Sequence, residues 1–151
     1  MVLTQLLQPT CVKVPLEGTD KDSVITELVD LLDSNGLLLD KDIAIETVLM
    51  REKIRGTGIG TGIAIPHGKC TAVNESVMAI GIAHEPIDFE SIDGKPVFVV
   101  VLLLSPPDQT GPHIQALARI GRLLLDKECK KALEEAESDE VVYEILNTWE
   151  H

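Results

Sequence analysis

The stretch GTGIGTGIAIPHG, residues 56–68, joins a glycine-rich segment to a short apolar run that a proline interrupts. Pro66 favours an extended conformation for Ile65 and cannot donate a backbone hydrogen bond, so we expect a strand to end here. His67 follows directly, which predicts an exposed imidazole at the carboxyl edge of a sheet, where α/β folds tend to place their sites. Gly68 has no side chain, and we expect it to leave one side of the imidazole open to a large reactant.

Apolar patterns on both sides of this stretch predict an α/β domain. Strands are expected at residues 77–83 and 97–104, and the second is apolar throughout, as is typical of strands buried on both faces. Upstream, apolar residues recur at helical spacing after Thr19, which we expect to cap the first helix. They recur again after Asp40, which we expect to cap a second helix that runs to about residue 53. Strands that alternate with helices favour a three-layer α/β/α arrangement.

A third helix is expected after the buried strand, because Thr110, Gly111 and Pro112 form a suitable first turn. Two shorter helices, at about residues 127–136 and 139–148, should complete the chain, the last one capped by Ser138. The apolar face of the third helix is expected to consist of Ile114, Leu117, Ala118, Gly121, Leu124 and Leu125.

Length and charge narrow the class of protein. The 151 residues are 44% hydrophobic, which excludes a disordered chain, and we expect a single domain spanning residues 1–151. The formal net charge of −12 argues against a nucleic-acid partner, because the phosphate backbone would be repelled. Residues 97–104 form the longest apolar run, far short of the about 20 residues that cross a membrane. With no signal-peptide pattern and an odd number of cysteines, we expect a cytoplasmic protein without disulfides.

The glycine-rich segment matches neither common nucleotide-binding motif. Counted from Gly58, the third glycine of a dinucleotide fingerprint would fall on Ile63, and the Gly-Lys pair at 68–69 is followed by Cys70 instead of serine or threonine. His67 and Cys70 have metal-ligand spacing, but no second pair accompanies them. We therefore expect neither a metal nor an organic cofactor.

Three side chains are candidates for chemistry on a phosphoryl group. A neutral imidazole such as His67 is a competent nucleophile once a hydrogen bond fixes its tautomer. His113 falls in the first turn of its helix, where backbone N–H groups and the dipole favour an anion. Arg51, at the end of the second helix, has a planar guanidinium that suits phosphate oxygens. A solvated or capping histidine and a helix-end cation are the alternatives for His113 and Arg51.

Four segments together resemble a known family. They are Arg51, the run Ile59-Gly60-Thr61-Gly62-Ile63-Ala64-Ile65-Pro66-His67-Gly68, the stretch Pro86-Ile87-Asp88-Phe89, and His113-Ile114-Gln115-Ala116-Leu117-Ala118. In this order they are similar to the enzyme IIA domain of the bacterial phosphoenolpyruvate-dependent phosphotransferase system, in its fructose/mannitol/nitrogen-regulatory class (type 2). The similarity extends from Leu7 to about Asn147, and the second histidine follows the first by 46 residues.

The resemblance implies a mixed sheet flanked by helices and a role for each site residue. His67 matches the family's phosphorylated histidine, which accepts its phosphoryl group from the carrier HPr or a nitrogen-branch relative. His113 matches the second active-site histidine, and Arg51 the arginine near the site. Backbone N–H groups near Gly68 are expected to assist in binding phosphate, and no metal or cofactor is required.

Two roles follow from the resemblance. The first is a regulatory phosphocarrier of the nitrogen type, whose phosphorylation state alters its binding to target proteins. The alternative is a IIA subunit that donates phosphate to a IIB partner during uptake of a fructose- or mannitol-type sugar. With no attached IIB, IIC or HPr-like segment, we expect a free-standing protein, and the wording of residues 59–66 leans to the nitrogen-regulatory branch. A binding module without phosphate chemistry is a third reading, which the presence of both histidines opposes.

Overall fold

The computed structural model describes residues 3–54 and 56–150 of the chain. Its elements, in chain order, are η1 (Leu3–Gln5), β1 (Leu7–Lys13), α1 (Lys21–Ser34), α2 (Lys41–Ile54), β2 (Gly58–Gly60), β3 (Ile63–Ala64), β4 (His67–Lys69), β5 (Val77–Ile87), β6 (Val97–Ser105), α3 (Thr110–Leu125), α4 (Lys127–Glu135) and α5 (Asp139–Glu150).

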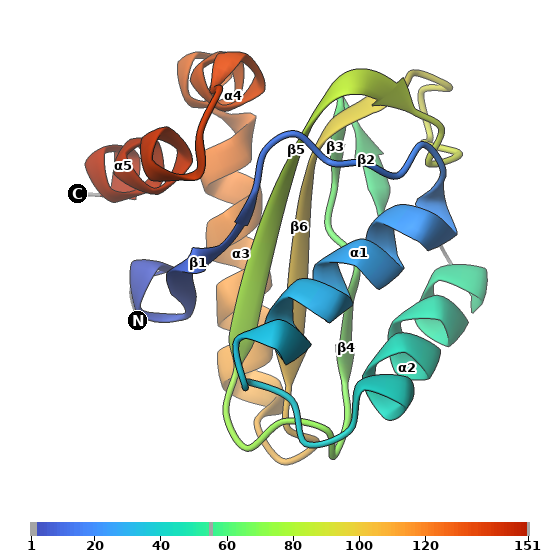
Figure 1. Ribbon diagram of the computed structural model, residues 1–151. Helices are drawn as coiled ribbons and strands as arrows, with labels where there is room; N and C mark the ends of the chain where they lie inside the picture. The colour runs from blue at the N-terminus through green and yellow to red at the C-terminus, as the bar shows by residue number, and fades with distance from the viewer. Residues whose placement is uncertain (1–2, 55, 151) are drawn as a thin grey trace.

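A single mixed sheet forms the middle layer. Five of its six strands follow the order β1-β5-β6-β3-β2, and the sixth, β4, also pairs with β6. The β5–β6 and β2–β3 pairs are antiparallel, whereas β1 runs parallel to β5, and both β3 and β4 run parallel to β6. In Figure 1, α1 and α2 lie in front of the sheet and α3 lies behind it. The predicted three-layer α/β/α fold with a mixed sheet is confirmed.

The central strand β6 is apolar from Val97 to Leu104 and almost entirely buried, as predicted, and it ends with the buried Ser105. It pairs along its length with β5 on one side and with the β3 and β4 segments on the other. The sequence prediction ended β5 too early, because β5 continues through Pro86, where the β5–β6 register shifts and proline is tolerated. β1 and β2 were not predicted.

The prediction that a strand ends at Pro66 is only half right. β3 does end at Ala64, but the chain rejoins the sheet at His67 and pairs with β6 as β4. Pro66 lacks an N–H, yet its carbonyl accepts a hydrogen bond from the Leu103 amide at 3.1 Å, so the interruption is local. His67 therefore begins a strand segment, opposite Leu103 near the carboxyl end of β6.

Two helices differ in detail from their predictions. The N-cap of α1 is Asp20, not Thr19, because Asp20 and Ser23 form a reciprocal capping box. The buried face of α3 is rotated from the predicted one: Ile114 and Leu125 are 60% and 68% exposed. The residues of α3 that face the sheet are His113, Ala116, Ile120 and Leu124, so a polar residue occupies one position of the buried stripe.

The remaining helices and the cysteines follow the predictions. α2 begins after Asp40, whose carboxylate accepts from the Ile43 amide, and α5 is capped by the Ser138 hydroxyl. All three cysteines are buried and free. Among residues 3–54 and 56–150, no helix has the length and apolar content needed to cross a bilayer.

Candidate functional site

The His67 side chain, at the start of β4, is held by a nearby backbone carbonyl. Its Nδ1 lies 2.7 Å from the carbonyl oxygen of Ile65. A carbonyl can only accept a hydrogen bond, so Nδ1 carries the hydrogen and Nε2 carries the lone pair. The side chain is half-buried, which leaves Nε2 as the nitrogen available for reaction with an incoming group.

The electrostatic surroundings keep His67 neutral. Burial lowers the pKa of His67 below its usual 6.5, and the hydrogen bond to the Ile65 carbonyl opposes that shift. The Arg51 cation lowers the pKa and the Glu52 carboxylate raises it, so burial is the largest cause of the net lowering. The imidazole is therefore uncharged near neutral pH, the state in which Nε2 is nucleophilic.

Arg51 and His67 line the same cavity. This cavity measures about 270 Å³ and is walled by β2, by the Ile65 and Ile92 side chains and by Leu117 of α3. Arg51 stands in the last turn of α2, half-buried. Its cation lies close enough to His67 to affect that ring's pKa, so the predicted association of Arg51 with the histidine holds in space.

His113 lies beside His67, in the first turn of α3. The two ring centroids are 5.6 Å apart and the ring planes are tilted by 52°. His113 is only 5% exposed, and its Nδ1 lies 2.7 Å from the Ser105 hydroxyl. Burial, followed by repulsion from His67 and Lys69, lowers the pKa of His113 to about 4. His113 is thus neutral near pH 7 and is no solvated helix cap.

Gly68 has a packing role that differs from the expected one. A Cβ at this position would lie 2.8 Å from Cγ2 of Thr47, because α2 packs directly on β4. The space left by the missing side chain is filled by α2, so close packing on Thr47 requires the glycine; that it also leaves one side of the His67 ring open stays a prediction. Phosphate binding by backbone N–H groups near Gly68 stays a prediction.

Three polar residues that the sequence analysis did not select support the site. Lys69 donates to the Thr110 hydroxyl at 2.9 Å and so ties β4 to the start of α3. Glu52 is buried, accepts hydrogen bonds from Thr57 and pairs with Lys21 at 3.3 Å. The third residue is Ser105, behind His113. A lysine two positions after His67 and a glutamate beside Arg51 were the available signals.

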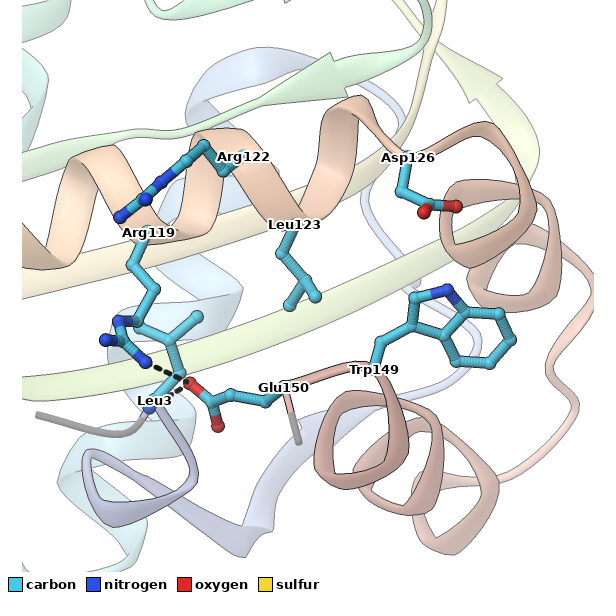
Figure 2. Close-up of a pocket in the computed structure, with 7 residues that line it drawn as sticks. All are labelled: Leu3, Arg119, Arg122, Leu123, Asp126, Trp149 and Glu150. Atoms are coloured by element: carbon cyan, nitrogen blue, oxygen red, sulfur yellow. Dashed lines mark hydrogen bonds and ion pairs between the residues drawn. The ribbon is translucent and has the colours of Figure 1, made fainter.

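Larger cavities lie elsewhere, and the one drawn in Figure 2 lacks a nucleophile. It measures about 340 Å³ and is lined by Leu3, Arg119, Arg122, Leu123, Asp126, Trp149 and Glu150 (Figure 2). Its carboxylates have structural partners: Glu150 accepts from the Leu3 and Thr4 amides, and Asp126 caps α4. The cavity of about 270 Å³ contains both the reactive histidine and Arg51, so it is the candidate active site. Within the described residues, no group of three or more histidine, cysteine or acidic side chains could hold a metal ion.

Comparisons with known proteins give consistent matches in sequence and in fold. A family model described as "Phosphoenolpyruvate-dependent sugar phosphotransferase system, EIIA 2" matches residues 5–149. The chain is 38% identical over 147 residues to a fructose-specific EIIABC component of Bacillus subtilis; the match covers 97% of this chain but only 23% of the relative's length. It is 37% identical to a nitrogen regulatory protein of Klebsiella oxytoca, covering 95% of this chain and 89% of the relative. The crystal structure of the nitrogen regulatory protein IIA-Ntr of Neisseria meningitidis superposes with a TM-score of 0.86 at 31% identity, covering 95% of this chain and 98% of the other.

Proposed function

The chain belongs to the EIIA type 2 family of the phosphoenolpyruvate-dependent sugar phosphotransferase system, and from this premise we propose that Nε2 of His67 accepts a phosphoryl group from HPr or a related carrier. The observation that supports this most is the hydrogen bond from Nδ1 of His67 to the Ile65 carbonyl, which leaves the Nε2 lone pair free beside Arg51. As an EIIA component the chain is a phosphoryl-transfer protein.

The transfer is an exchange of one P–N bond for another. The bond between phosphorus and the carrier's histidine breaks as the Nε2 lone pair of His67 forms the new bond, and Nδ1 keeps its hydrogen throughout. Such reactions need positioning and charge stabilisation more than covalent assistance. The Arg51 guanidinium supplies positive charge, and His113, whose ring centroid lies 5.6 Å from that of His67, supplies a hydrogen-bond donor.

The surroundings of the cavity suit docking of a protein. Ile59 and Ile92 line the cavity and yet are 45% and 83% exposed. Apolar side chains exposed next to a reactive group favour contact with a partner surface. The net charge of −12 favours a partner with a basic face.

We propose the regulatory role of the nitrogen type as the physiological function, with phosphorylation of His67 altering the binding of target proteins. The similarity to nitrogen regulatory proteins, in sequence and in structure, supports this role. The second candidate is donation of the phosphoryl group to a IIB component for sugar uptake, which the 38% identity to a fructose-specific EIIABC component favours.

Incubation with phosphoenolpyruvate, enzyme I and HPr tests the proposed chemistry. We expect a mass gain of one phosphate that is labile in acid and stable in base, and we expect His67→Ala to abolish it. His84→Ala, which changes an exposed histidine hydrogen-bonded to the Ala136 carbonyl, is the matched control and should label normally. Labelling of His67→Ala would contradict the assignment. Mixing the phosphorylated protein with a fructose-type IIB then separates the two roles, because rapid loss of label to IIB supports sugar uptake.

A further inference from the structure

A pair of serine hydroxyls lies behind His113. Ser105, the last residue of β6, is fully buried, and its Oγ lies 2.7 Å from Nδ1 of His113 and 2.9 Å from Oγ of Ser76. Ser76 is half-buried and immediately precedes β5. The hydrogen-bonded series Ser76–Ser105–His113 therefore runs from the sheet to the second histidine of the site.

The type of partner decides which nitrogen carries the hydrogen. The Ile65 carbonyl can only accept, so it forces the hydrogen of His67 onto Nδ1. A serine hydroxyl can donate or accept, so the tautomer of His113 depends on the direction of the hydrogen bond between Ser76 and Ser105. When Ser76 donates to Ser105, the hydrogen of Ser105 is directed to Nδ1 of His113, and the ring must carry its own hydrogen on Nε2.

We propose that Ser105 is a positioning residue for phosphoryl transfer: its hydroxyl, oriented by Ser76, donates to Nδ1 of His113 and keeps the Nε2–H form that donates to a phosphoryl group on His67. This inference rests on the proposed phosphorylation of His67. In the opposite tautomer, the Nε2 lone pair would face phosphoryl oxygens and repel them.

Two further observations explain why the tautomer of His113 decides whether the ring can donate a hydrogen bond to the phosphoryl group. The pKa of His113 is about 4, so near pH 7 the ring holds a single hydrogen and has only one donor to offer. The ring is also fixed in place, since it is 5% exposed and the start of α3 is tied to β4 by the hydrogen bond from Lys69 to Thr110. Rotation of the ring cannot replace the missing donor.

The test is ¹⁵N NMR of histidine-labelled, unphosphorylated protein at pH 7, comparing wild type with Ser105→Ala. We expect His113 in the Nε2–H form in wild type and a shift toward Nδ1–H in the variant, while His67 keeps Nδ1–H in both. Phosphoryl transfer should slow by about 3- to 10-fold, the effect of one uncharged hydrogen bond. An Nδ1–H form of His113 in wild type, or an unchanged tautomer and rate in Ser105→Ala, would overturn the proposal.

Two more variants keep the result interpretable. Ser76→Ala, at a half-buried position, should shift the tautomer in the same direction even where Ser105→Ala fails to fold, and an unshifted tautomer there would count against the series. Ser91→Ala removes a buried hydroxyl that has no hydrogen-bond partner among the described residues, so it should change neither signal. Because the NMR signal needs no phosphate, an Nε2–H tautomer in a protein that takes no label would refute the proposed function and leave the tautomer assignment standing.

Discussion

His67 and His113 lie on different elements of the fold. Each ring is held by a hydrogen bond at Nδ1, but the two bonds have opposite consequences for Nε2. His67 begins β4 and bonds through Nδ1 to a backbone carbonyl, whereas His113 lies in α3 and bonds through Nδ1 to a side-chain hydroxyl. The carbonyl leaves a lone pair on Nε2, and the hydroxyl permits a hydrogen there. One imidazole thus becomes suited to attack and its neighbour to donation, and the partner atom makes the difference.

The two histidines also differ in whether a side-chain substitution can change their tautomer. The Ile65 carbonyl belongs to the backbone and remains after any side-chain substitution, so the tautomer of His67 is fixed by the fold itself. The tautomer of His113 depends on the Ser105 side chain and can be changed. The two histidines also differ in exposure, since His67 is half-buried and His113 almost wholly buried. Only the more accessible ring is placed to meet a partner protein.

Replacing Arg51 tests the charge on the His67 side. A charge-assisted hydrogen bond contributes roughly 1.5–3 kcal/mol. If Arg51 forms such a bond mainly in the transition state, Arg51→Ala should slow phosphoryl transfer by about 10- to 100-fold. Rates of labelling from phosphorylated HPr measure the effect. Arg122→Ala, at an exposed arginine of the cavity drawn in Figure 2, is the matched control and should leave the rate unchanged. A folded Arg51→Ala protein with the wild-type rate would make Arg51 a helix-end cation of α2.

Replacing His113 tests the donor side of the comparison. His113→Ala should still form some phospho-His67, because the nucleophile is intact, but should pass the phosphoryl group on about 10-fold more slowly. His113→Gln keeps a donor and should be milder. Peptide mapping of the labelled wild type accompanies the rates. Phosphate on His113, or two phosphates per chain, would contradict the division of roles.

The best predictions from the sequence concern features that residues close together in the chain determine. The apolar run of β6, the Asp40 cap of α2 and the first turn of α3 all follow from residues that are close together in the chain, and all are confirmed. The errors come from long-range contacts. Pro66 was expected to end the strand, but pairing with β6 begins again at His67, the next residue. The face of α3 was misplaced because apolar residues alone were counted, while His113 is the polar member of the buried stripe.

The site was predictable as a set of residues but not as a geometry. The motif around His67 and the position of His113 were visible in the sequence, yet nothing in it gives the 5.6 Å between the rings. Ser105 was not selected from the sequence, because its partner His113 lies on another element. Gly68 shows the same limit: its missing side chain makes room for Thr47, on a helix that precedes it by about twenty residues.

The smallest effect we expect is that of pH on the free energy of unfolding. It tests the difference in burial between His113 and His67. Because the pKa of His113 is about 4 in the folded state and near 6.5 when unfolded, the unfolded chain binds more protons between these values. Stability is therefore lost as the pH falls from 6.5 toward 4. His67, whose pKa is also lowered, contributes in the same direction, while the lowered carboxyl pKa values of Asp20 and Asp93 act only at more acidic pH. Urea unfolding at pH 7 and pH 5 should show that His113→Gln loses less stability than wild type, by on the order of 1 kcal/mol.

Between pH 7 and pH 8, where His113 is neutral in both states, the two proteins should change alike. An equal loss at pH 5 would mean that His113 is charged or hydrated in the folded protein, which would remove the need for Ser105 to select its tautomer.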